Sequence, residues 1–174
     1  ETIALEKEQS TEPVEPIHYT VEADVTCSDT AIGLLFNATD SKNFYMMQLN
    51  IKDQPGKVIF KPHTWKDGAF ATYGSHIKDV TGIIGSVEEF ATKAAHVKID
   101  VTETTITTFI NDQEVDVFTI GETSDQGTTG IPAQVGYLGF RADLTEAGTV
   151  DNYKLVDYTN SSDGDIVYNY TFDS

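Results

Sequence analysis

The feature of this sequence that most constrains its fold is a two-residue alternation of apolar and polar side chains that begins at Ile17. One side of the alternation carries Tyr19, Val21, Ala23, Val25 and Cys27, and the other carries Thr20, Glu22, Asp24 and Thr26. A period of two places successive side chains on opposite faces of a β-strand, whereas a helix repeats every 3.6 residues. The segment is therefore predicted to be a strand with one buried face and one face in water.

Similar short segments follow along the chain, so that about eleven strands are predicted in all. The others are 31–36, 44–51, 58–65, 69–77, 96–101, 104–110, 115–120, 135–141, 150–158 and 166–172. Asp67 and Gly68 form a strong hairpin signal between two of them. One short helix is expected from Ser86, because Ser86 and Glu89 have the spacing of a capping box. Many short strands without βαβ alternation or a fixed repeat predict an all-β, two-sheet antiparallel β-sandwich with at most one short helix.

The length of 174 residues fits one domain, because chains commonly divide into separate cores only beyond roughly 250 residues. Residues 1–16 are polar, contain two prolines and are expected to be a linker or a loosely attached arm. The sandwich is expected over 17–158, and 159–174 is expected to be a C-terminal strand or the start of the junction to a following domain. The chain starts at Glu1 without a signal peptide, so it is interpreted as a mature or excised fragment.

The acidic composition disfavours several classes of partner. The formal net charge is −17 and the isoelectric point is about 4.3, so phosphate backbones and anionic lipid surfaces would be repelled. No run of about 18 apolar residues is present to span a bilayer. Neutral sugars carry no charge, so the negative charge of the chain does not repel them. We therefore expect an extracellular protein, secreted or at the cell surface, that is monomeric and binds neither nucleic acid nor membrane.

Cys27 is the only cysteine, so no internal disulfide can form. Its place in the alternation predicts a small buried residue, the alternative being a reactive thiol. A secreted domain of this size without disulfides points toward a bacterial source. Three glycosylation sequons, at Asn37, Asn160 and Asn169, are interpreted as chance triplets in a chain rich in Thr and Asn.

Four segments carry a family resemblance: Ala31–Phe36, Asn43–Leu49, His96–Ile99 with Thr105–Asn111, and Gly136–Arg141 with Val150–Tyr153. In their order and spacing they resemble concanavalin A-like lectin/glucanase modules, which are laminin-G-like jelly rolls appended to bacterial glycoside hydrolases such as fructan-active or α-L-rhamnosidase-like enzymes. The resemblance covers roughly residues 17–158. It implies a jelly roll that often binds carbohydrate through polar and aromatic side chains on its concave face or rim, without fixing the ligand.

Catalysis is not expected of this chain. Glycoside hydrolysis needs two carboxyl groups roughly 5 to 9.5 Å apart. Catalytic members of the resembling fold commonly carry them on one strand as Glu-x-Asp-x-x-Glu. Here Glu22 and Asp24 match the first two positions, but Cys27 occupies the third, so the pair is interpreted as a solvated strand face. No other catalytic motif is present, and no catalytic residue is predicted.

Sugar recognition requires an aromatic ring for the apolar side of a sugar and planar polar groups for its hydroxyls. Trp65 is the only Trp and is the best stacking candidate, the alternative being a buried packing residue. The other predicted carbohydrate contacts are Tyr73, His76, Asn43, Gln48 and Arg141, each of which has a structural alternative.

Metal binding is a weaker expectation. His18, His63, His76 and His96 lack the close spacing of a zinc site and are interpreted as surface or rim residues. A structural calcium ion suits an acidic β-sandwich better, and Asp151 with Asn152 is the best donor pair. The alternative is that this pair caps a turn or contacts Arg141.

These observations favour a non-catalytic carbohydrate-binding module of a secreted multidomain polysaccharide-degrading enzyme, with a catalytic domain in the same parent chain as its partner. A second hypothesis is a spacer β-sandwich without ligand that supports a neighbouring glycoside hydrolase domain. A third, a hydrolase in its own right, is opposed by the incomplete carboxylate set. Fold-level analogy alone does not decide between the first two.

Overall fold

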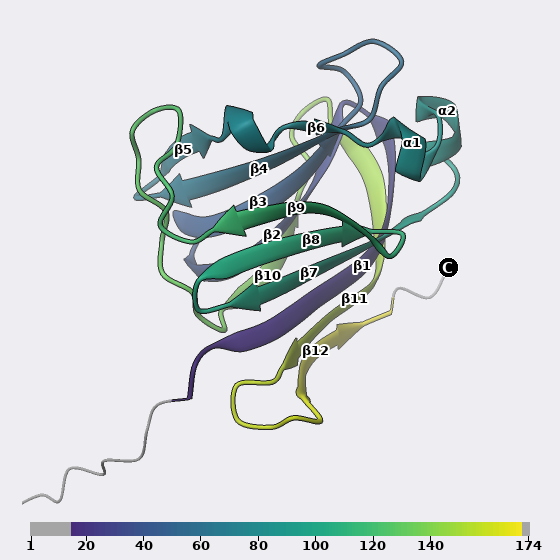
Figure 1. The fold of residues 1–174 in the computed structure, drawn as a ribbon. Helices are drawn as coiled ribbons and strands as arrows, with labels where there is room; N and C mark the ends of the chain where they lie inside the picture. The colour runs from purple at the N-terminus through teal and green to yellow at the C-terminus, as the bar shows by residue number, and fades with distance from the viewer. Residues whose placement is uncertain (1–14, 172–174) are drawn as a thin grey trace, which may run out of the picture.

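The computed structural model describes residues 15–171, which form two antiparallel sheets packed face to face (Figure 1). Sheet A contains, in spatial order, β12 (Asp165–Tyr170), β11 (Ala147–Asp157), β1 (His18–Asp29), β7 (Ala95–Thr102), β8 (Thr105–Ile110) and β9 (Gln113–Thr119). Sheet B contains β10 (Tyr137–Arg141), β2 (Ala31–Asp40), β3 (Asn43–Asn50), β4 (Ile59–Lys66) and β5 (Ala69–Thr72), with the short β6 (Lys78–Asp79) paired to β4. The predicted two-sheet β-sandwich is confirmed.

The core lies between the inner faces of the two sheets. The alternating apolar residues of β1, from Tyr19 to Cys27, are all buried, as the sequence predicts. From sheet B they meet Tyr45 and Phe60, and the Tyr45 ring contacts the Phe118 ring of sheet A edge-on at 5.8 Å. Burial raises the pKa of the Cys27 thiol to about 11, so Cys27 is an unreactive core residue.

Two hairpins join neighbouring strands through two-residue turns, the first of them at the predicted position. Asp67 and Gly68 join β4 to β5 with φ values of 53° and 79°, and Asn111 and Asp112 join β8 to β9 with 48° and 63°. Positive φ at both central residues is the type I′ geometry that matches the twist of antiparallel strands. The Asp67–Gly68 hairpin fixes the position of Trp65 near the end of β4.

The connection from β5 to β7 departs from the expected pattern. A single strand was predicted over 69–77, but β5 ends at Thr72 and a 3₁₀ turn, η1 (Gly74–His76), follows. Gly74 and Thr72 donate hydrogen bonds to the Asp125 carboxylate, which turns the chain at this point. Within residues 15–171 there are two four-residue helices, α1 (Thr81–Ile84) and α2 (Val87–Phe90), where at most one was expected. The predicted capping box of Ser86 and Glu89 is present at α2.

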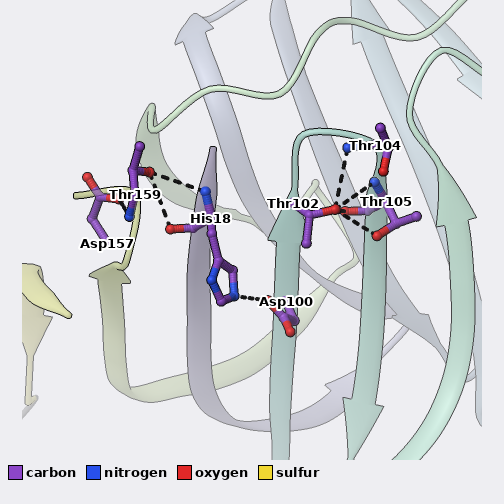
Figure 2. Close-up of polar contacts among 7 residues, drawn as sticks. All are labelled: His18, Asp100, Thr102, Thr104, Thr105, Asp157 and Thr159. Atoms are coloured by element: carbon purple, nitrogen blue, oxygen red, sulfur yellow. Dashed lines mark hydrogen bonds and ion pairs between the residues drawn. The ribbon is translucent and has the colours of Figure 1, made fainter. Parts of the chain in front are cut away.

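The start of β1 is fixed to both of its neighbours in sheet A (Figure 2). The His18 backbone N–H donates to Thr159 Oγ1 at 3.2 Å, and the Thr159 hydroxyl faces the His18 carbonyl at 3.4 Å. On the other side, His18 Nε2 lies 3.0 Å from Asp100 Oδ1. The β11–β12 connection is therefore tied to the first residue of the sandwich, and β12 continues sheet A beyond residue 158.

The residues assigned to the arm fall largely outside the described range, since only Glu15 and Pro16 of 1–16 are included. Among the described residues, no helix has the length and apolar character needed to cross a membrane.

One buried polar side chain links β2 to the segment that precedes β10. Asn37 is fully buried; its Oδ1 accepts hydrogen bonds from the Tyr19 hydroxyl at 3.1 Å and the Gln134 N–H at 2.8 Å. Its Nδ2 donates to the Pro132 carbonyl at 2.9 Å. Its φ of 56° is left-handed, a conformation that Asn tolerates better than most residues. An amide engaged in this way cannot accept a glycan in the folded state.

We expect Asn37→Ala to lower the free energy of unfolding by about 2 to 4 kcal/mol, because it leaves buried donors and acceptors unpaired and strains the backbone. Urea denaturation followed by circular dichroism measures the change. Asn160→Ala, at an exposed sequon, is the matched control and should stay within about 0.5 kcal/mol of the wild type. Equal midpoints for the two variants would contradict the proposed role of Asn37.

Candidate functional site

The outer face of sheet B differs from an ordinary wet strand face. On sheet A, β7 alternates between buried and partly exposed residues, but along β3 every residue after Asn43 is buried. The side of β3 that faces away from the core carries Phe44, Met46, Gln48 and Asn50. Phe44 is 6% exposed and Met46 is fully buried, so other side chains cover this face of β3.

Neighbouring strands extend this surface across sheet B. In the β3–β4 register Phe44 is opposite Trp65, Met46 opposite His63 and Gln48 opposite Lys61. Next to Met46 in space lies Gly33, where an added Cβ would come within 2.5 Å of the Met46 sulfur. Glycine at this position therefore leaves room for the Met46 side chain against β2. We call the surface made by these residues, with Phe70 and Arg141, the sheet B outer face.

An aromatic cluster occupies one end of the sheet B outer face. The Trp65 ring stacks on Phe44 at 5.5 Å with an interplanar angle of 17°, and meets Phe70 edge-on at 5.3 Å. The Arg141 guanidinium carbon lies 5.7 Å from the Trp65 ring centroid, a cation–π distance. The indole is therefore half-buried, and Phe70 is its more open neighbour, with 42% of its surface exposed.

Positively charged, negatively charged and neutral polar side chains complete the face. Arg141 Nη2 lies 2.7 Å from Asp143 Oδ2, and Gln48 Nε2 donates to Glu146 Oε1 at 3.4 Å. Asp143 and Glu146 come from the β10–β11 loop, where the Asp143 N–H donates to Glu146 Oε2 at 2.6 Å. Each of these side chains is planar and already oriented by a neighbour. Together they present donors and acceptors side by side, next to aromatic rings.

His63 is the main correction to the sequence reading of this face. It was expected at the surface or rim, but its exposed fraction is 2%, because its ring packs on Phe70 at 4.7 Å. Its Nδ1 has no hydrogen-bond partner among the described residues. Burial, together with the positive charges of Lys61 and Arg141, lowers the pKa of His63 to about 3. His63 is therefore neutral at physiological pH.

Of the predicted carbohydrate contacts, the structure brings Trp65, Gln48 and Arg141 together on the sheet B outer face. Asn43 lies at the first position of β3, in the turn that follows β2, where its amide bonds Asp40 and the Asp67 N–H. It orients this end of the sheet without joining the face itself.

Tyr73 and His76 lie elsewhere. Tyr73 was expected to share a rim with Trp65, but it is 1% exposed, packs edge-on against Phe118 at 4.7 Å and shares a hydrogen bond with Thr64 at 2.7 Å. Its ring therefore faces the core and offers no surface to a ligand. His76 is held between Asp116 at 2.8 Å and Glu122 at 3.0 Å, so both ring nitrogens are engaged at the end of the sandwich.

The carboxylates of β1 lie on the outer face of sheet A, as expected for a solvated strand face. His96 Nδ1 lies 2.8 Å from Asp24 Oδ1, and its Nε2 lies 3.5 Å from Glu22 Oε2. Partial burial raises the pKa of Asp24, but hydrogen bonds from Asn152 and His96 outweigh this effect and the net shift is downward. The Asn152 amide is thus committed to Asp24, at 2.7 Å.

The calcium hypothesis gains no support from this region. The Asn152 N–H donates to Asp151 Oδ1 at 2.7 Å, which is a turn contact within the pair. In residues 15–171 no group of three or more His, Cys, Asp or Glu side chains is arranged to hold a metal ion. Calcium binding therefore stays a prediction, with no residues assigned as its ligands.

Several residues of the sheet B outer face were not among the sequence-based candidates: Phe44, Lys61, His63, Phe70, Asp143 and Glu146. For two of them a signal was present, because Lys61 and His63 precede Trp65 at two-residue steps in one strand and must share its face. Asp143 and Glu146 lie in a loop, where no periodicity reports the direction of a side chain.

Comparison with known proteins identifies the fold. No protein-family model matches the sequence, and no curated protein matches it. Among solved structures, the carbohydrate-binding module CBM66 from Bacillus subtilis is 16% identical over 81% of this chain and 74% of that chain, with a TM-score of 0.54. Two ancestral congerins are each 8% identical over 80% of this chain and 90% of theirs, with TM-scores of 0.52 and 0.50. The fold is a lectin-type jelly roll.

The buried, neutral state of His63 predicts a specific loss of stability in acid. The pKa is about 3 in the folded chain and 6.5 in an unperturbed His, so protons bind preferentially to the unfolded chain as pH falls below about 6.5. The free energy of unfolding should therefore decrease by up to about 1.4 kcal/mol per pH unit between these two values. Urea denaturation at pH 7 and pH 5 should show a larger decrease for the wild type than for His63→Gln. An NMR titration midpoint for His63 near 6.5 would refute this.

Proposed function

We propose that this chain is a non-catalytic carbohydrate-binding module and that the sheet B outer face is its glycan-binding surface. One observation carries the proposal. An aromatic cluster lies next to planar polar groups that are already oriented, on a strand face that points away from the core. Sugars present apolar C–H faces and closely spaced hydroxyls, and this combination of side chains satisfies both.

The charge balance of the face favours a neutral ligand. Lys61 forms an ion pair with Asp53, and Arg141 forms one with Asp143. The two cations of the surface are thus matched locally by carboxylates, although the chain as a whole carries −17. A charged glycan would have to displace one of these ion pairs, whereas hydroxyl groups can bond to the pairs as they stand.

We further propose that the module belongs to a secreted or cell-surface polysaccharide-degrading enzyme and has a catalytic domain of the same parent chain as its neighbour. The name of the CBM66 module, which has a similar fold, supports a binding role at the level of analogy. The two β1 carboxylates, Glu22 and Asp24, engage His96 and Asn152, which supports a structural role for them rather than a catalytic one.

A spacer without ligand is the second candidate, and one observation favours it. The Trp65 ring already contacts Phe44, Phe70 and Arg141, so these contacts serve to hold sheet B together whether or not a sugar binds. The two functions differ in whether the exposed side chains of the face have an affinity for glycan.

Phe70→Ala and Arg141→Ala test the proposal most directly, because both side chains reach solvent and their removal leaves the core intact. On affinity gels that contain xylan, β-glucan, galactan or fructan, we expect the retention of each variant to fall by roughly 10-fold or more, since each loses about 1.4 kcal/mol or more of contact with the sugar. Trp65→Ala should reduce retention more than either of these two variants.

Phe109→Ala is the matched aromatic control, because Phe109 is partly exposed on the outer face of sheet A. It should be retained like the wild type, and circular dichroism should show that all variants are folded. If no gel retains the wild type, the spacer function replaces the proposal, and if every variant is retained like the wild type, the sheet B outer face is not the binding surface. Turnover of any of these polysaccharides by the isolated chain would overturn both.

A further inference from the structure

A concave surface lies at the side of the sandwich where the edge strands of the two sheets, β10 and β12, come close to each other. It is a groove of about 400 Å³, which is within the size range of small-ligand sites. One wall comes from sheet B and the segment before β10, and the other from β12. Its lining residues are Ala38, Thr39, Gln134, Val135, Gly136, Tyr137, Val167 and Tyr168. We call it the edge groove.

The register of sheet A explains why tyrosine rings lie along this edge of the sandwich. Tyr168 and Tyr170 of β12 are opposite Leu155 and Tyr153, which face the core, so the two tyrosines lie on the inner side of the sheet. β12 is the last strand of sheet A, and Tyr170 is 50% exposed there. The rings of Tyr168 and Tyr170 are nearly parallel, at 16°. From the other wall, Tyr137 is 64% exposed.

The chemistry of the groove selects the class of ligand. None of its eight lining residues is charged, in a chain with 28 acidic and 11 basic residues. An ionic partner would find no counter-charge in it. The lining combines tyrosine rings with phenol, amide and hydroxyl groups, so it suits a neutral ligand that has apolar faces and many hydroxyls. Neutral carbohydrate has this chemistry, whereas a purely apolar ligand would leave the polar groups unpaired.

We propose that the edge groove is a second carbohydrate-binding site, with Tyr137 and Tyr168 as its aromatic contacts. The proposal shares the ligand class of the proposed function but none of its residues. Tyr137 and Arg141 are the first and last residues of β10, so the edge groove and the sheet B outer face adjoin the same strand. One polysaccharide chain can contact both sites, and each contact raises the effective concentration of the other.

Tyr137→Ala is the direct test, because the side chain is mostly exposed and its loss does not disturb the core. Ile166→Ala is the matched control, since Ile166 is 65% exposed on β12 and does not line the groove. On gels containing xylan, β-glucan, galactan or fructan, we expect Tyr137→Ala to reduce retention by roughly 2- to 10-fold, the value of one aromatic contact, and Ile166→Ala to have no effect. Tyr137→Ala should also remove the retention that persists in Arg141→Ala.

The outcomes separate the two sites. Equal retention of Tyr137→Ala and Ile166→Ala, with loss only in Arg141→Ala, overturns the edge groove and leaves the proposed function standing. Loss in Tyr137→Ala with wild-type retention of Arg141→Ala supports the edge groove and overturns the sheet B outer face.

Changes in the amide chemical shifts of residues 134–137 and 167–168, in NMR titrations with oligosaccharides of the polysaccharide that retains the protein, would support the groove. Stronger retention on polygalacturonate than on every neutral gel would contradict its neutral chemistry, and no retention of the wild type on any gel overturns both sites.

Discussion

The rest of the structure depends on the burial of two pleated strand faces against each other. β1 contributes Tyr19, Val21 and their alternating neighbours, and the opposite sheet contributes Tyr45 and Phe60. Burial of apolar surface is the main favourable contribution to folding, and it fixes which side of every strand points inward. A slip of one residue in any strand would exchange its two faces. Once the inner faces are committed to the core, the composition of the outer faces is free to differ between the two sheets.

The environments of two histidines show how the outer faces of the two sheets differ. His96 lies on sheet A, partly exposed, between two carboxylates. His63 lies on sheet B, buried against Phe70 and near Lys61 and Arg141, where the neutral ring is favoured. The same side chain is thus a partner for charge on one face and a neutral packing group on the other. The outer face of sheet A is an ordinary solvated strand layer, whereas that of sheet B is covered by aromatic rings and by the side chains of Lys61 and Arg141.

The sequence predicted those elements whose cause is local. The alternation in β1, the Asp67–Gly68 hairpin and the Ser86–Glu89 capping box depend on residues within a few positions of one another, and all three are present. The break after Thr72 has a distant cause, because Asp125 binds the backbone there from another loop.

For the same reason, the sequence predicted the grouping of the candidate site's residues only in part. Trp65, Gln48 and Arg141 were chosen as candidates by residue type, but their grouping follows from cross-strand register, and register is not encoded in any one segment. Tyr73 was misplaced because the chain bends after β5 and turns its ring into the core. His63 was placed at the surface because polar residues usually are, whereas packing against Phe70 on a covered outer face overrides that tendency.

The side chains of the two proposed surfaces differ in how firmly they are held before a ligand binds, and this affects how the surfaces would share one ligand. On the sheet B outer face, Arg141 is held by Asp143 and by the Trp65 ring, and Gln48 by Glu146, so little side-chain freedom remains to be lost on binding. In the edge groove, Tyr137 is mostly exposed, so a ligand must immobilise it at some cost in entropy. The preorganised surface should therefore set the intrinsic affinity. The groove gains most from a polysaccharide that is already bound nearby, because its binding step is then intramolecular.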